Sequence, residues 1–269
     1  SYSDNLNVGK GQVTVRFQGN YLGSYGKEFD IKKASASKYS VALSKTSFVY
    51  NGKTQKPSVT VKNSKGKVLK NGRDYTVSVP NAKNIGKYTA KVTFKGNYSG
   101  SISKSFAIVP KGTAIKKVSA SMQGFGVEWK KQTKKTTGYQ VKYSTDKAFK
   151  KNVKTVTVKG NKNVKKSFSK LGNYNTYYVR ARVYSTVKQS GKNVNLYSGW
   201  CQVKSVKTKG VPAVKLNSVK SGEYAFTANY NRNSGVTGYQ VQYSTASNFK
   251  GAKTITKKNT KTKAKSYST

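Results

Sequence analysis

The 269-residue chain contains no histidine, one cysteine, one methionine and only seven acidic residues. Without histidine it cannot form a Ser–His or Cys–His catalytic pair or an imidazole metal site. The lone Cys201 excludes an intramolecular disulfide and an ordinary zinc site. The sequence also lacks an apolar run long enough to span a membrane. We therefore expect no enzyme, no catalytic residue, no metal and no cofactor.

The few acids are scattered along the chain. Glycoside hydrolysis needs two carboxylates that face each other across a cleft. Glu28 and Asp30 instead fall side by side on one face of a predicted strand. Asp74 precedes a strand in a Gly-Arg-Asp turn, where an Asx turn or an ion pair with Arg73 explains it. The acids therefore indicate structural roles.

Positive charge dominates the composition, with 53 lysines and arginines and a formal net charge of +46. The basic residues are spread along the chain and do not form a tail. Aromatic residues make up 12% of the sequence, and apolar positions alternate regularly, as in a folded chain. Two interpretations stay open: a solvated, lysine-covered surface, or attraction to polyanions such as teichoic acids, acidic polysaccharides, anionic lipid or nucleic acid.

Two internal repeats divide the chain into modules. The segment from Asn7 to Ile31 recurs from Asn84 to Ile108, and the segment from Gly138 to Thr145 recurs from Gly238 to Thr245. Together with small-residue and proline-containing linkers, the repeats predict a partial module at 1–36, complete modules at 37–110 and 111–210, and a partial module at 211–269. Neither partial module can close a core alone, so we expect each to need missing sequence or a neighbouring copy, or to be disordered.

Period-two alternation of apolar and polar residues predicts strands almost everywhere. In the second module, Ala90, Val92 and Phe94 point one way, whereas Lys87, Lys91 and Lys95 point the other. Turn dipeptides such as Asn51-Gly52 separate the strands. Short strands about ten residues apart predict an all-β chain of tandem β-sandwiches, arranged as beads on a string.

The third module resembles a fibronectin type III domain. The residues that carry the resemblance are Trp129 in Val127-Glu128-Trp129, the pattern Tyr139-x-Val141-x-Tyr143, and Leu171 followed six residues later by Tyr177-x-Val179-x-Ala181. The resemblance implies that Trp129, Tyr139, Tyr143, Leu171 and Tyr177 belong to the core, with the hydroxyl of Tyr177 bonded back to the backbone. The fourth module matches through Tyr239, Val241 and Tyr243.

The first two modules resemble bacterial Ig-like repeats. The matching segments include Val49-Tyr50-Asn51-Gly52, Pro57-Ser58-Val59-Thr60-Val61, Asn84-Ile85-Gly86-Lys87-Tyr88 and Gly96-Asn97-Tyr98-Ser99-Gly100. Phe94 and Phe106 are the expected core residues of the second module. Tandem modules of these two kinds are similar to stalks of secreted or wall-attached proteins of Gram-positive Firmicutes, which implies an extracellular, cell-surface location.

Basic side chains are the candidate binding residues. Lys87, Lys91 and Lys95 share one strand face at a spacing of about 13 Å. Lys142, Arg180 and Arg182 are expected on the solvent side of the third module, with Tyr178 and Tyr184 between them. Cations interleaved with exposed aromatics suit anionic sugars or single-stranded nucleic acid. The alternative is that lysine stems only cover the surface and protect edge strands.

The sequence thus favours a non-enzymatic stalk or spacer with a cationic surface suited to anionic cell-wall polymers or host polysaccharides. No nucleic-acid-binding signature accompanies the charge, so no specific nucleic acid is expected. Three alternatives stay open: an adhesin with a specific ligand face, accessory modules of an extracellular enzyme, and a subunit of a self-assembling surface fibre. The expected partners are anionic polymers, other modules of the same parent protein, and further copies of the chain.

Overall fold

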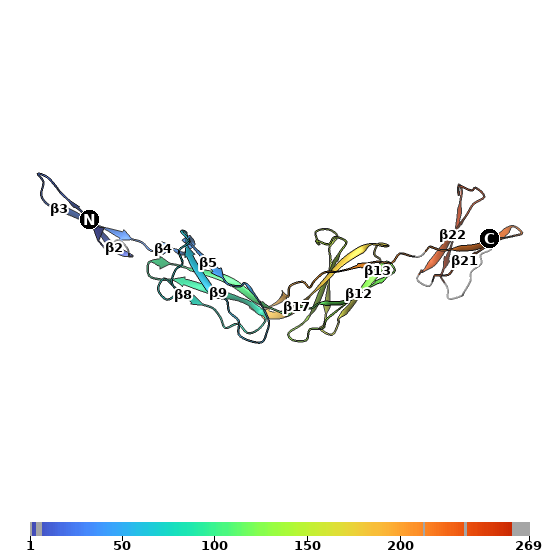
Figure 1. The fold of residues 1–269 in the computed structure, drawn as a ribbon, viewed down its shortest axis with the longest axis horizontal. Helices are drawn as coiled ribbons and strands as arrows, with labels where there is room; N and C mark the ends of the chain where they lie inside the picture. The colour runs from blue at the N-terminus through green and yellow to red at the C-terminus, as the bar shows by residue number, and fades with distance from the viewer. Residues whose placement is uncertain (1, 4–6, 212, 234–235, 260–269) are drawn as a thin grey trace.

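The computed structural model describes residues 2–3, 7–211, 213–233 and 236–259. Apart from one short 3₁₀ helix, η1 (Ala36–Lys38), the regular structure in these ranges is β-strand. Figure 1 shows the modules in a row, with β2 and β3 toward one end and β21 and β22 toward the other. The predicted fold class, an all-β chain of tandem sandwiches, is confirmed. No helix among the described residues is long and apolar enough to cross a membrane.

The first module is a single three-stranded antiparallel sheet. It contains β1 (Tyr2–Ser3), β2 (Gly9–Arg16) and β3 (Ser24–Ile31), with β2 in the centre. Val15 and Phe17 are 56% and 53% exposed, whereas Val92 and Phe94, their counterparts in the repeat, are 0% and 5% exposed. The first module therefore has the strands of a sandwich half and leaves the face that would form its core open to solvent.

The second module closes a sandwich around a core of its own. Its strands are β4 (Ala34–Ser35), β5 (Tyr39–Leu43), β6 (Ser47–Val49), β7 (Val59–Asn63), β8 (Tyr75–Ser78), β9 (Gly86–Phe94), β10 (Tyr98–Ser99) and β11 (Ser101–Val109). The sheet β6-β11-β9-β8 faces the pair β5-β7. Val61, Val92 and Phe94 pack in one buried cluster, and Phe106 and Ile108 pack in a second.

Residues 34–36, which the sequence predicts in the first module, pack with the second. Strand β4 pairs in parallel with β10, and Ala36 is buried in the cluster that contains Val41 and Phe94. The small side chains that favour a linker also fit a tightly packed strand, so composition alone did not locate the junction.

The third module is a sandwich with a three-stranded sheet and a larger, five-stranded sheet. Its strands are β12 (Ile115–Ser121), β13 (Gly124–Trp129), β14 (Gly138–Ser144), β15 (Lys154–Lys159), β16 (Lys165–Phe168), β17 (Thr176–Gln189), β18 (Lys192–Tyr197) and β19 (Lys204–Lys207). The sheet β12-β13-β16 packs against a sheet in which β17 pairs with β14, β18 and β19. The first residues of β17 pair with β19, and its last six pair with β18.

The residues expected in the core of the third module lie in or against one cluster. Trp129 and Tyr139 are fully buried, and their ring centroids are 5.4 Å apart. Tyr177 is buried, and its hydroxyl accepts a hydrogen bond from the backbone N–H of Gly172 at 3.3 Å. Tyr143 and Leu171 are partly buried and pack against the same cluster.

The fourth module has two separate hairpins. One consists of β20 (Leu216–Gly222) and β21 (Ala225–Tyr230), and the other of β22 (Gly238–Tyr243) and β23 (Lys253–Lys258). The rings of Tyr230 and Tyr239 lie 4.7 Å apart, centroid to centroid, and join the two hairpins at one end.

Modules contact one another through corresponding segments. The backbone N–H of Val8 donates to Asn97 Oδ1 at 3.0 Å, which joins the first module to the second. The side chain of Gln189, at the end of β17, binds both the N–H and the C=O of Lys87, at 3.0 and 2.7 Å. Residues 7–10 and 84–87 are repeat counterparts, so each of the first two modules uses the same segment to contact the module that follows.

Candidate anion-binding surface

The second module carries a flat cationic face on its four-stranded sheet. Lys87 and Lys91 are exposed on β9, Lys95 is exposed directly after it, and all three alternate with buried or half-buried residues. The residue opposite Lys91 is Ser103 on β11 and Ser78 on β8. A further row of exposed hydroxyl residues flanks the lysines, namely Thr76, Thr89, Thr93, Ser101 and Ser105. The face therefore offers ammonium groups separated by hydrogen-bonding hydroxyls.

The third module holds a tighter cluster of cations on its larger sheet. Lys142 on β14 lies opposite Arg180 on β17, and Arg182 follows two residues later on the same face. Gln140 fixes Arg182, since Gln140 Oε1 accepts from Nε at 3.0 Å and from Nη2 at 2.7 Å. All three cations are half-buried. We call Lys142, Arg180 and Arg182 the β14–β17 cation cluster.

Aromatic rings hold this cluster in place. The indole of Trp200 lies beneath all three cations, with its centroid 4.9 Å from Lys142 Nζ, 5.1 Å from Arg180 Cζ and 4.3 Å from Arg182 Cζ. Phe149 stacks under Arg180 at 4.1 Å, and Tyr197 under Arg182 at 4.0 Å. Each such contact stabilises a cation by about 0.5–1 kcal/mol at an exposed site and more when it is desolvated.

These ring partners differ from those that the sequence indicates. Tyr184 is buried, 5% exposed, so it is not an exposed aromatic between the arginines. Trp200, Phe149 and Tyr197 take that role instead, and they come from other strands and loops. Strand alternation identifies neighbours on one strand, but it carries no signal for rings brought in by a loop between β14 and β15 or by the segment after β18.

The two cationic surfaces have no carboxylate partners within the described ranges. The ion pairs there join Lys10 to Asp30, Arg73 to Asp74, and Lys116 and Lys165 to Glu128. Burial, followed by the charges of Arg180 and Arg182, lowers the pKa of Lys142. Burial likewise lowers the pKa of Arg182. The cluster is thus self-repulsive, and an anion placed beside it would relieve that repulsion.

Asp74 and Asp146 have structural roles. Asp74 is buried and accepts from the backbone N–H of Lys70 at 2.7 Å and from Arg73 Nε at 2.8 Å. Asp146 accepts from the N–H groups of Ala148 and Lys150 in the turn after β14. No group of three or more histidine, cysteine or acidic residues that could hold a metal occurs among the described residues.

Acid should destabilise the second module through Asp74. The hydrogen bond from Arg73, helped by that from the Lys70 backbone, lowers the pKa of Asp74 below its ordinary value of 3.8. The unfolded chain therefore binds the proton more tightly, and stability present above about pH 4 is lost as pH falls through the folded-state pKa. We expect Asp74→Asn to flatten this acid limb in calorimetric melts between pH 7 and 2.5. Asp146→Asn, in the third module, should leave the acid limb of the second module unchanged, and an unaltered limb in Asp74→Asn would contradict the assignment.

Comparison with known proteins identifies no family for the chain. No family model matches it, and no curated protein matches it. Among solved structures, it is similar to the FN1–FN3 domains of chicken CNTN1, with 11% identity, coverage of 84% of this chain and 86% of that one, and a TM-score of 0.30. It is also similar to domains A168–A170 of titin, with 15% identity, coverage of 75% of each chain and a TM-score of 0.26.

Proposed function

We propose that this chain is a non-enzymatic spacer segment of an extracellular bacterial surface or secreted protein, and that its cationic faces bind anionic polymers of the cell wall or of host polysaccharides. The observation that carries the proposal is the presence of two ordered sets of three cations without a carboxylate partner among the described residues: the lysine row on β9 and the β14–β17 cation cluster.

The spacer part of the proposal is supported by the arrangement of the modules. They follow one another in a row (Figure 1), so the length of the molecule grows with the number of modules. The Gln189–Lys87 hydrogen bonds and the apolar contact of Leu196 with Ile85 limit motion at the junction between the second and third modules. A row of docked modules holds whatever is attached at one end at a distance from the other.

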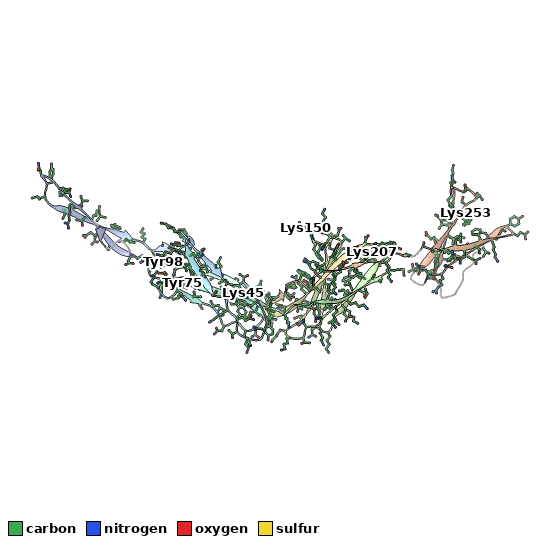
Figure 2. The ribbon with its side chains drawn as sticks, viewed as in Figure 1. Lys45, Tyr75, Tyr98, Lys150, Lys207 and Lys253 are labelled. Carbon is green, nitrogen blue, oxygen red and sulfur yellow. The ribbon has the colours of Figure 1, made fainter. Side chains whose placement is uncertain are left out.

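The binding part is supported by charge and by its distribution. Lysines such as Lys45, Lys150, Lys207 and Lys253 extend from the second to the fourth module (Figure 2). A polyanion that runs along such a surface releases counterions from each neutralised charge, so its affinity falls steeply as salt rises. The rings beneath the β14–β17 cation cluster keep three charges in fixed positions, which lowers the entropy that binding must remove.

The test is co-sedimentation of the whole chain with purified Gram-positive cell walls, with and without teichoic acid, across a salt series. We expect binding that needs teichoic acid and weakens at least tenfold between about 50 and 200 mM salt. The triple variant Lys87→Gln, Lys91→Gln, Lys95→Gln should weaken binding several-fold and reduce the salt dependence. The control removes the same charge from the smaller sheet of the third module and the turn before β16, away from both cationic surfaces, with Lys117→Gln, Lys162→Gln and Lys166→Gln.

Each outcome has a distinct meaning. If the two triple variants lose affinity for the cell walls equally, the attraction depends on total charge and not on a binding face along β9. No binding at low salt would reject the polyanion part of the proposal altogether. Binding that persists at 500 mM salt would contradict an electrostatic mechanism and favour a specific adhesin.

A further inference from the structure

A polar groove lies beside the β14–β17 cation cluster on the larger sheet of the third module. Its volume is 410 Å³, which is within the range of about 300–1,000 Å³ that small-molecule sites occupy. Three threonines, two asparagines, two tyrosines, one lysine and one glycine line it. Apart from the glycine, every lining residue carries a hydroxyl, amide or ammonium group. We call this space the polar groove.

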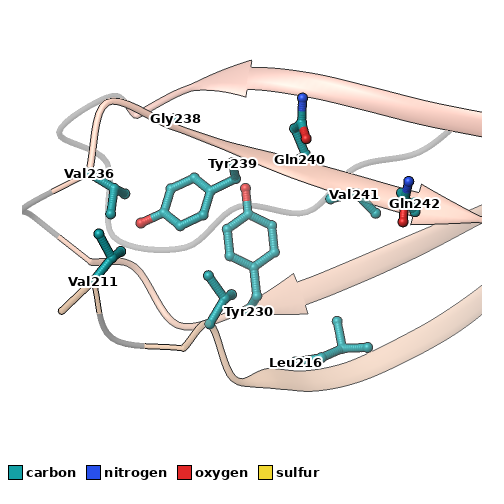
Figure 3. Close-up of a pocket in the computed structure, with 10 residues that line it drawn as sticks. Val211, Leu216, Tyr230, Val236, Gly238, Tyr239, Gln240, Val241 and Gln242 are labelled. Atoms are coloured by element: carbon teal, nitrogen blue, oxygen red, sulfur yellow. The ribbon is translucent and has the colours of Figure 1, made fainter. Parts of the chain in front are cut away.

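The lining of the polar groove differs from that of the hollow in the fourth module. Valines, a leucine and two tyrosines make up most of the lining of that hollow, and Figure 3 shows Val211, Val236, Tyr230 and Tyr239 around it. Amides and hydroxyls that lose contact with water need other hydrogen-bonding partners. The polar groove therefore suits a ligand that is rich in hydroxyl groups, and the apolar hollow does not.

Two asparagines of β18 provide hydrogen-bonding groups for such a ligand. Asn193, opposite Lys188, is exposed, and its side chain has no hydrogen-bond partner among the described residues. Asn195 Oδ1 accepts from Thr186 Oγ1 at 2.7 Å, which orients the amide. The Nδ2 group of Asn195 has no acceptor in the described part of the chain. The groove therefore holds amide groups that the sheet positions and that the chain itself leaves unused.

The polar groove and the cation cluster are joined through shared residues. Tyr197 lines the groove, and its ring lies under Arg182 at 4.0 Å. Thr157 also lines the groove, and its Oγ1 accepts from Gln140 Nε2 at 3.2 Å, while Gln140 Oε1 holds Arg182. Tyr184, in the groove, and Arg182 are two residues apart on one face of β17, a rise of about 7 Å. A sugar ring in the groove would therefore have a guanidinium group beside it.

The neighbouring Arg180 has its guanidinium faces covered and its hydrogen-bonding capacity unused. Phe149 and Trp200 lie against it at 4.1 and 5.1 Å. Its Nε is buried, and no group among the described residues accepts a hydrogen bond from its side chain. The N–H groups at the edge of a stacked guanidinium point along its plane, where the two oxygens of a carboxylate fit side by side. The cluster therefore suits a carboxylate in one fixed position.

We propose that the polar groove and the β14–β17 cation cluster form one binding site for a saccharide whose rings carry carboxylates. One sugar ring lies in the groove, where the amides of Asn193 and Asn195 bond its hydroxyls. Its carboxylate, or that of the next ring, lies at the N–H edges of Arg180 and Arg182. The inference rests on the proposed function and names the class of anionic polymer that the third module binds.

The test is isothermal titration calorimetry of the whole chain with trigalacturonate at about 150 mM salt, where diffuse attraction is weakened. We expect one saturable site per chain. A polyacrylate with the same number of carboxylates should bind at least about tenfold more weakly, because it has no ring hydroxyls for the groove. Maltotriose, which has the rings without the charge, should not bind measurably. Binding should also change the fluorescence of Trp200, which contacts the cluster, since Trp129 is fully buried.

Two variants that keep the net charge separate this site from diffuse attraction. The double variant Asn193→Ala, Asn195→Ala should weaken trigalacturonate binding at least about fivefold and change polyacrylate binding less than about twofold. Arg180→Lys should do the same, because an ammonium group cannot match two carboxylate oxygens as a guanidinium does. The matched control, Asn81→Ala with Asn173→Ala, removes two exposed amides that lie outside the groove and make no hydrogen bond to the described residues. It should bind trigalacturonate like the unchanged chain.

The inference is overturned if trigalacturonate binds no more tightly than the polyacrylate, or if the asparagine variant and its control bind it equally. Its failure is distinct from failure of the proposed function. Binding to cell walls without binding to trigalacturonate would leave the diffuse attraction alone, and the reverse result would leave this site alone. A hyaluronan hexasaccharide, also with three carboxylates, represents host polysaccharides. If it binds more tightly than trigalacturonate, the site prefers alternating neutral and acidic rings, and either preference supports the site.

Discussion

Replacing Trp129 with alanine should remove about 3–5 kcal/mol from the stability of the third module. The side chain is fully buried between the sheets, against Tyr139 and Val141. Its Nε1 has no hydrogen-bond partner among the described residues, so the loss comes from packing and from the cavity left behind. For a module of this size, the midpoint of thermal unfolding should fall by at least about 12 °C.

The second tryptophan supplies both the reporter and the control. In Trp129→Ala the remaining indole is Trp200, which lies against the β14–β17 cation cluster and so reports unfolding of the same module. Trp200→Ala, monitored through Trp129, removes three ring–cation contacts between half-buried side chains and should cost less, about 1.5–3 kcal/mol. The free energy of unfolding of both variants is measured by fluorescence and confirmed by calorimetry. Equal decreases would contradict the assignment of Trp129 as the main core residue of the third module.

Local patterns were sufficient to predict most strands and the inward-facing residues. In β9 the alternation of Lys87, Thr89 and Lys91 with buried residues follows directly from the period of a half-buried strand. The offset between repeats also relates Val15 to Val92, and the structure shows how differently the two are buried. Alternation determines which face a residue takes. It does not determine whether anything covers that face.

Contacts between distant segments were beyond the sequence patterns. Trp200 and Phe149 lie about fifty residues apart in the chain and meet at Arg180 only because a turn and a strand end converge there. Gln189 is the last residue of β17, and nothing in the sequence around it marks it as a contact residue. The backbone that it binds, that of Lys87, is in another module. Such contacts depend on the path of the backbone, for which a single sequence gives no local signal.

Replacing Leu196 with aspartate should uncouple the second and third modules. Leu196, on β18, is 5% exposed and packs against Ile85, Phe106 and Ile108 of the second module. Burying a carboxylate among these side chains would cost several kcal/mol, so the junction should open instead. We expect small-angle X-ray scattering to show a broader range of overall dimensions, and hydrogen exchange to show faster exchange at the Lys87 amide, whose N–H is bonded to Gln189.

Asn195→Asp is the matched control, because it adds the same charge one residue away on the exposed face of the hairpin. Its carboxylate can still accept the hydrogen bond that Thr186 Oγ1 donates to Asn195 at 2.7 Å. If Leu196→Asp and Asn195→Asp give the same scattering curve as the unchanged chain, then the junction is not held by the contact of Leu196 with the second module. If only Leu196→Asp changes it, then a single leucine and the repeat segment around Ile85 set the relative position of two sandwiches. The buried apolar clusters of the second module include no side chain of residues 7–33 among the described residues, so the junction between the first and second modules should respond less to the same kind of change.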